Sequence, residues 1–389
     1  MVYAPSLTPR PSPLRPHVLA KEHLHEWLPL NPSPTPLAGP TEADPHSTSS
    51  LDMNKLLQIK ALRERAWDES TLTTYGSGLL VFHVFCDSKD IAEADRAPAS
   101  HTLIISFIAS LARCYSGSTI TNYVSGIRAW HLLHSLKWQV DKLDLDILIR
   151  AADKSAPPTS KHPPCEPFTI NYIISLRQHL ALDNPLHAAV FACLTMAFYG
   201  TAHLGELTVP TLNSFDPTKH IKPLDVRTET DRHGLISTVF HIPKTKTAKV
   251  SGKDIYWAQQ EGPLDPLAAY NNHLQVNEPT HADHLFSYLH KGKHRPLTKQ
   301  AFIKTLTQAT QAARVPALKG HAICIGSTLE YLLHGVPLEA MKAKGHWASD
   351  AFSVYLTHHA QVLAPYIQAQ LELHMAFLQL TIPSPRNCR

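Results

Sequence analysis

The sequence contains few of the features that mark secreted, membrane or zinc-binding proteins. Its six cysteines are scattered without a Cys-x-x-Cys pair, which argues against a disulfide framework and a structural zinc site and suggests a reducing compartment. No apolar run approaches the ~18 residues of a membrane span, and the N-terminal residues lack the continuous apolar stretch of a secretory signal. The net charge is only +4, which permits binding to nucleic acid without requiring it. Arginine is scarce too, since 26 histidines outnumber the arginines.

Composition divides the 389 residues into successive regions. Residues 1–53 are rich in proline, serine and threonine and are predicted to form a disordered tail. Residues 54–153 carry repeated helical patterns and predict a small all-α domain of four helices. The proline-rich stretch 154–167 indicates an exposed linker. A second domain is expected over 168–375, followed by a C-terminal tail at 376–389.

The second domain is predicted to be mostly helical with a small antiparallel sheet. Thr169 precedes a helical pattern as its N-cap, and Asn184-Pro185 starts a second helix. This helix, 186–199, is apolar nearly all round and therefore central. Segments 235–243 and 253–258 flank a lysine-rich turn, which predicts a β-hairpin with a basic tip. Further helices are expected at 298–313, 322–333, 337–343, 348–356 and around 362–380.

Residues able to handle a phosphate group recur in this domain in a fixed order. A histidine follows the central helix, and a lysine lies in the hairpin turn. A histidine and a cysteine then share one helix, and a histidine and a tyrosine share the segment after it. The stretches that carry them are YGTAHLGEL (199–207), PKTKT (243–247), GHAIC (320–324) and KGHWASDAFSVYL (344–356).

This order and these spacings resemble the tyrosine recombinase (phage integrase) family, and most closely the integrase-like recombinases of fungal mobile elements. The resemblance covers about 54–375. It implies a chain that is mainly α with a small antiparallel sheet, in which a helical SAM-like core-binding domain precedes a mixed α+β catalytic domain.

The resemblance also implies a reaction on double-stranded DNA without metal or cofactor. Tyr355 would attack a phosphodiester and hold the 3′ phosphate as a phosphotyrosine, which a 5′ hydroxyl later reverses. Lys246 would protonate the leaving 5′ oxygen, with Lys244 as the neighbouring alternative. His321 and His346 would hydrogen-bond the phosphate and assist proton transfer.

Two residues depart from the family pattern. The family binds the non-bridging phosphate oxygens with two arginines, and this chain has His203 and Cys324 at those positions. A neutral thiol cannot replace a guanidinium, and a histidine with a pKa near ~6.5 is mostly neutral at cellular pH. The resemblance therefore predicts a catalytically impaired remnant of a mobile element. Arginine codons beginning CG become histidine or cysteine codons by one transition, which would also explain the histidine excess.

Other functions remain open on the sequence. An active enzyme could use His203 with Lys319 or Lys342 in place of the arginines. The fold could also serve as a DNA-binding or interaction module without catalysis, or as a helical scaffold with no nucleic-acid role. Structurally, Cys324 could be a small buried hydrophobe, and His203 could be a cation at a helix C-terminus.

Contacts with DNA outside the site are expected mainly at phosphates. The stretch GSTITNYVSGIRAW (117–130) places four polar side chains near one face of a predicted helix. These candidates are Thr119, Asn122, Ser125 and Arg128. The stretch STLTTYGSG (70–78) offers similar hydroxyl groups.

No metal site is expected, because the histidine-rich stretches EHLHEW (22–27) and THHAQ (357–361) lack a convergent set of ligands. The resemblance to recombinases of eukaryotic mobile elements implies a nuclear location. It also implies assembly of a homo-oligomer, a tetramer, on DNA.

Overall fold

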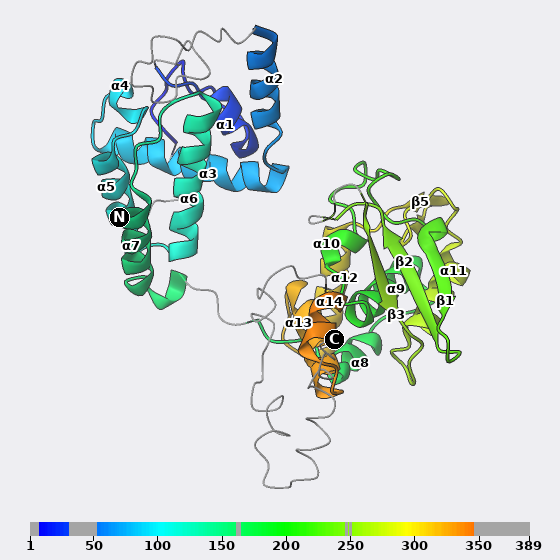
Figure 1. Cartoon of the computed structure of the whole chain (residues 1–389). Coiled ribbons are helices and arrows are strands. Elements are labelled where there is room, and N and C mark those ends of the chain that lie inside the picture. Colours follow the sequence, from blue (N-terminus) through cyan, green and yellow to red (C-terminus); the bar gives the residue numbers. More distant parts are fainter. Residues whose placement is uncertain (1–7, 31–52, 161–164, 246–247, 249–250, 346–389) are drawn as a thin grey trace, which may run out of the picture. The chain divides into compact units, whose positions relative to one another are not determined.

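The computed structural model describes residues 8–30, 53–160, 165–245, 248 and 251–345. It divides into two compact units, Met1–Pro163 (unit 1) and Pro164–Arg389 (unit 2), which are drawn in Figure 1. The division falls inside the range 154–167. The described chain is mainly helical with two small antiparallel sheets, which confirms the predicted fold class. None of its helices is both long and apolar enough to span a membrane.

Unit 1 is a helical bundle around two long helices, α3 (Glu69–Ser88) and α6 (Gly117–Leu133). The four expected helices are present as α3, α5, α6 and α7, and shorter elements surround them. The remaining elements are η1 (Ala20–Glu22), α1 (His23–Glu26), α2 (Met53–Glu64), α4 (Glu93–Arg96), α5 (His101–Leu111), α7 (Lys142–Lys154) and η2 (Pro158–Ser160).

Helices α3 and α6 touch through their backbones because glycines lie where they cross. A Cβ atom at Gly78 would overlap the Cα of Tyr123, and a Cβ at Gly126 would overlap the carbonyl oxygen of Tyr75. Neither glycine can therefore accept a side chain without a shift of one helix.

Gly126→Ala should accordingly destabilise unit 1 by about 1–3 kcal/mol, because overpacking outweighs the better helix propensity of alanine. Urea unfolding followed by far-UV circular dichroism measures this loss. Gly205→Ala is the matched control, since a Cβ there meets no atom within 4 Å. Equal stability of the two variants would contradict the close crossing.

The expectation of a disordered tail over 1–53 is wrong for residues 8–30, here called the N-terminal segment. This segment packs on α3 and α6, and its Leu24 and Trp27 belong to the core of unit 1. Trp130 Nε1 donates to the carbonyl of Trp27 at 2.7 Å, and a Cβ at Gly76 would collide with the Ala20 carbonyl. The proline-rich composition concealed these few anchoring residues. Residues 31–52 lie outside the described residues.

Ion pairs attach the same segment to the end of α3 and to α4. Arg15 makes two hydrogen bonds to the carboxylate of Glu93, at 2.8 and 2.6 Å. The backbone N–H of Arg10 donates to Asp87 at 2.7 Å, and Arg96 donates to the other oxygen of Asp87 at 2.8 Å. Because Arg15 is buried, loss of its partner Glu93 would leave an unpaired buried charge, which is strongly destabilising.

Unit 2 is built around α9 (Pro185–Tyr199), which is buried along most of its length as predicted. The predicted cap and helix start are confirmed: Thr169 accepts a hydrogen bond at the start of α8 (Ile170–Arg177), and α9 starts after Asn184, which accepts two. The other helical elements are α10 (Leu204–Leu207), η3 (Pro223–Asp225), α11 (Pro266–Asn277), α12 (Lys299–Ala313), α13 (His321–Leu333) and α14 (Leu338–Lys344).

The predicted hairpin is confirmed as β2 (Ile236–Ile242) and β3 (Lys253–Trp257), paired antiparallel. An additional strand, β1 (Val226–Thr230), extends the sheet in the order β1-β2-β3. A second hairpin consists of β4 (Tyr288–His290) and β5 (Lys293–Arg295). The helices expected at 348–356 and 362–380, and the tail at 376–389, lie outside the described residues.

Candidate functional site

His203 and Cys324 are in contact although 121 residues separate them, with Cys324 Sγ 3.3 Å from His203 Nδ1. The thiol also donates to the carbonyl of Ala202 at 3.3 Å. Cys324 is only 1% exposed, and burial raises its pKa to about 12. The side chain is therefore a neutral, buried thiol, in agreement with its interpretation as a small buried residue.

The turn that carries His203 is held between α13 and the sheet. Gly200 is the C-cap of helix α9, and a Cβ at this residue would be blocked by Ile255 of β3 at 2.7 Å. The next residue, Thr201, has a φ of 55°, and its hydroxyl pairs with that of Ser327 on α13 at 2.8 Å. Strain of this kind persists only where the surroundings fix it, so the position of His203 is well determined.

His203 begins helix α10 rather than ending α9. It is the N-cap residue of α10, and its backbone N–H donates to Glu206 at 3.1 Å. The interpretation of His203 as a cation at a helix C-terminus is therefore wrong. The chain reverses at Gly200 and Thr201, so the imidazole lies at the start of a new helix.

His321 lies beside this pair as the first residue of α13. Its side chain is exposed, and partial burial, followed by the charge of His203, lowers its pKa. The preceding Gly320 packs on Leu204 of α10, whose Cδ2 is 2.9 Å from a Cβ built there. The start of α13 and the start of α10 thus form one rim that carries His203, His321 and Cys324.

The other three predicted catalytic residues, Lys246, His346 and Tyr355, lie outside the described residues. The base of the hairpin turn is described: Thr245 N–H donates to the carbonyl of Ala248 at 3.1 Å, and Ala248 N–H donates to Thr245 Oγ1 at 3.0 Å. Lys244 precedes this turn with an exposed side chain.

Lys344 makes contacts near this rim that the sequence did not reveal. Its Nζ donates to the carbonyl of Tyr256 on β3 at 2.8 Å and lies 4.8 Å from the centroid of the Tyr331 ring. Burial lowers its pKa to about 8. The hydroxyl of Tyr331 in turn donates to the carbonyl of Tyr199 at 2.7 Å. Lys344 therefore holds the end of α14 against β3 and α13. No spacing rule could have indicated this, since the acceptor is a backbone carbonyl.

The four predicted DNA-contacting residues all lie on α6 of unit 1. Asn122 and Arg128 are exposed, and Thr119 and Ser125 are half-buried. The hydroxyl of Thr119 is hydrogen-bonded to that of Ser116, the N-cap of the helix, at 3.0 Å. Their contact with DNA stays a prediction.

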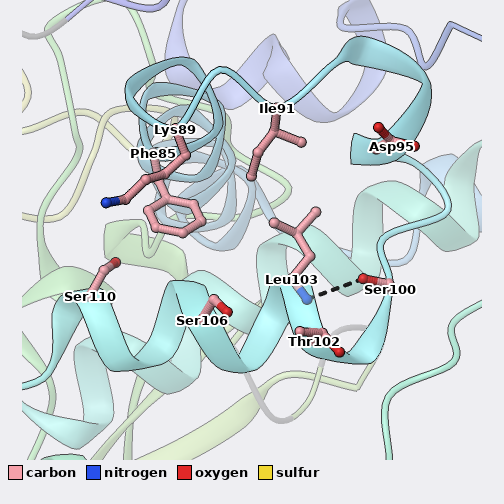
Figure 2. Close-up of a pocket in the computed structure, with 9 residues that line it drawn as sticks. All are labelled: Phe85, Lys89, Ile91, Asp95, Ser100, Thr102, Leu103, Ser106 and Ser110. Carbon is pink, nitrogen blue, oxygen red and sulfur yellow. Dashed lines mark hydrogen bonds between the residues drawn. The ribbon is translucent and has the colours of Figure 1, made fainter.

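A cavity in unit 1 has a volume of about 560 Å³ and lies between α3 and α5, as Figure 2 shows. Phe85, Ile91 and Leu103 form its apolar part, and Ser106 and Ser110 line it from α5. Its lining includes neither histidine nor cysteine. The cavity is thus not the site at which the motif residues gather. Within the described part of the chain, no cluster of three or more potential metal ligands occurs either.

Neither a family model nor a curated protein matches the chain. Solved structures of recombinases do match it. A XerH site-specific recombinase bound to a palindromic difH substrate in a post-cleavage complex is 14% identical, with a TM-score of 0.48 over 80% of this chain and 84% of that chain. A XerA recombinase is 13% identical, with a TM-score of 0.36 over 82% and 99%. A Flpe–Holliday junction complex is 12% identical, with a TM-score of 0.34 over 79% and 80%.

Proposed function

We propose that the chain is a DNA-binding relative of the tyrosine recombinases whose strand breakage through a 3′-phosphotyrosine at Tyr355 is impaired. The observation that carries this proposal is the contact between His203 and Cys324. The motifs imply that these two positions meet at one phosphate, and their side chains are 3.3 Å apart across 121 residues of sequence. An accidental match of two short motifs would not require such a contact. The nearby His321 adds support.

The impairment follows from the electrostatics of the rim. Phosphoryl transfer needs cationic donors on the two non-bridging oxygens. Cys324 has no charge to offer, and its thiol donates a hydrogen bond to the carbonyl of Ala202. His203 Nδ1 faces the sulfur, and the lowered pKa of His321 keeps that imidazole neutral. The loss of a single donor of this kind typically reduces the rate by about 10²–10³-fold.

Restoring both arginines should increase covalent capture of DNA by at least ~10²-fold. Three proteins are incubated with nicked duplex DNA: the natural chain, His203→Arg/Cys324→Arg, and the same double variant with Tyr355→Phe added. Detergent-resistant protein–DNA adducts are then scored. Because Cys324 is buried, His203→Arg alone is included, and a thermal melt checks that each variant is folded.

Adduct formed only by the arginine-restored protein supports the proposal. If the natural chain formed the adduct equally well, it would be an active enzyme in which other cations bind the non-bridging phosphate oxygens. Lys319→Ala and Lys342→Ala would then show which lysine replaces the arginines.

The second candidate function is a DNA-binding or interaction module without catalysis. The neutral, buried thiol of Cys324 favours it, because a site maintained for cleavage would need a cation there. Salt-dependent DNA binding without adduct from any folded variant would support this module. An absence of DNA binding at every salt concentration would instead support a helical scaffold.

We further propose that the protein derives from a mobile element, acts in the nucleus and assembles as a homo-oligomer on two duplexes. The histidine at 203 and the cysteine at 324 are each one transition from an arginine codon beginning CG. A coding sequence with high CG-dinucleotide content and no transition bias would contradict this origin. Sedimentation with and without DNA would test the assembly.

A further inference from the structure

The hairpin formed by β4 and β5 carries positive charge that the proposed site does not use. Its two strands are joined by Lys291 and Gly292, and Lys293 and Arg295 follow on β5. Both lysines are exposed and Arg295 is half-buried. Among the residues that the structure describes, none of these three cations has an acidic partner in an ion pair.

Three other cations of unit 2 are neutralised locally. Lys219 pairs with Asp216 at 2.5 Å, and Lys222 pairs with Asp225 at 3.1 Å. Arg227 pairs with Glu229 at 2.7 Å and also with Asp254. The hairpin cations are thus left available for an anionic partner.

The tip of the hairpin has an unusual conformation for a lysine. Lys291 has a φ of 51° and Gly292 a φ of 73°, the combination typical of a two-residue turn that favours Asn-Gly or Gly-Gly. A residue with a side chain in this left-handed backbone conformation costs roughly 1 kcal/mol. The turn therefore presents a lysine where glycine or asparagine would be more stable.

The charges project from a fixed base. The side chain of Asn277, which is fully buried, accepts a hydrogen bond at Oδ1 from the backbone N–H of Leu289 at 3.0 Å, and the backbone carbonyl of Asn277 contacts His294 Nε2 at 2.7 Å. The other nitrogen of His294 pairs with Asp283 at 3.0 Å. A rigid hairpin loses little conformational entropy when it binds.

The pairing register puts most of the charge on one face. Directly paired residues of an antiparallel ladder point to the same side, so the pairs Tyr288–Arg295 and His290–Lys293 share a face. This face is buried at its Tyr288 end, so Arg295 is half-buried there, whereas Lys293 and the turn residue Lys291 carry the exposed charge at the tip. Flexible exposed lysines suit neighbouring phosphates.

We propose that the β4–β5 hairpin binds the phosphate backbone of duplex DNA, away from the residues that gather around Cys324. This inference rests on the proposed DNA-binding function and extends it to a second surface of unit 2. In Figure 1 the hairpin is found at the label β5.

The test uses the full chain and duplex DNA, with affinity measured at several salt concentrations. Lys291→Gln/Lys293→Gln should make the slope of log affinity against log salt shallower by about 2, at about 0.9 per cation. Between 50 and 200 mM salt the variant should then lose about 10-fold less affinity than the natural chain. Lys291→Arg/Lys293→Arg should retain the natural slope.

Arg232→Gln/Lys304→Gln is the matched control, because it removes two other exposed cations of unit 2. Acetylation footprinting adds a positional readout, in which DNA should protect Lys291 and Lys293 but leave Lys304 reactive. A natural slope in the hairpin variant, or an equal loss in the control, would overturn the hairpin proposal while DNA binding stands. An absence of salt-dependent binding by the natural chain would overturn the hairpin proposal together with the proposed DNA-binding function.

Discussion

Trp27→Ala should destabilise unit 1 by about 3–5 kcal/mol, the range typical of removing a buried aromatic side chain. Trp27 is 3% exposed. Its ring stacks on His23 with centroids 3.9 Å apart and meets His83 edge-on at 5.5 Å. Its Nε1 donates to the carbonyl of Pro16 at 3.0 Å. The alanine would therefore leave a cavity and an acceptor without its donor. Urea unfolding at neutral pH, followed by far-UV circular dichroism, measures the loss.

Leu30→Ala is the control within the same segment, since Leu30 is 47% exposed and its loss should change stability by less than about 0.5 kcal/mol. Deletion of residues 1–30 should destabilise unit 1 more than Trp27→Ala does. Trp130 Nε1 would also lose its acceptor, and Glu93 would lose its buried partner Arg15. If Trp27→Ala and Leu30→Ala were equally stable, the N-terminal segment would not be part of the core of unit 1.

Acidification from pH 7 to pH 5 should destabilise unit 2 by about 4 kcal/mol through two buried histidines. Burial lowers the pKa of His273 to about 4 and that of His284 to about 3. In the unfolded chain both would titrate near ~6.5, so the unfolded state binds protons first as the pH falls. Stability is therefore full above pH ~6.5 and declines below it, by about 2 kcal/mol per histidine at pH 5.

The hydrogen bonds explain why neither ring accepts a proton easily. His273 Nε2 contacts the carbonyl of Leu285 at 2.8 Å, and its Nδ1 faces the side-chain amide of Asn277 at 3.0 Å. His284 Nδ1 accepts from the backbone N–H of Phe286 at 3.3 Å. A second proton on either ring would thus point at another donor. His220 and His294 are the neighbouring titratable groups, and each disfavours the charged form.

The stability of unit 2 is measured by urea unfolding at pH 7, 6 and 5. Hydrogen–deuterium exchange of peptides from α9 and α11 reports the unfolding of this unit. His284→Gln should remove about half of the pH dependence, whereas His281→Gln should leave it unchanged, because His281 is exposed. Stability that is the same at pH 7 and pH 5 would contradict the assignment of neutral buried histidines.

Local signals in the sequence predicted the parts of the fold that depend on local chemistry. Thr169 and Asn184 cap helices because their side chains satisfy the first backbone N–H groups, and the alternation of 235–243 marks a half-buried strand. The strand β1 escaped prediction because four of its five residues are exposed, so no apolar alternation marks it. The N-terminal segment escaped for a different reason, since its anchors, such as Trp27, are isolated within a polar composition.

In the candidate site, too, the sequence indicated some residues and missed another. The motifs predicted that His203, His321 and Cys324 share one site, and the structure places His203 Nδ1 3.3 Å from Cys324 Sγ. Spacing could not reveal Lys344, whose partners are the carbonyl of Tyr256 and the face of Tyr331. Contacts to backbone atoms and ring faces leave no residue-type pattern in a sequence.

The distribution of thiols makes the chain suitable for fluorescence labelling. Burial raises the pKa of Cys86 and of Cys324 to about 12 and raises that of Cys193 further, so these sulfurs should react slowly with maleimides. Cys114 in unit 1 and Cys165 in unit 2 are only half-buried. After Cys388→Ser, a donor and an acceptor dye would attach with one dye in each unit. Energy transfer between them would then report directly whether DNA draws the two units together.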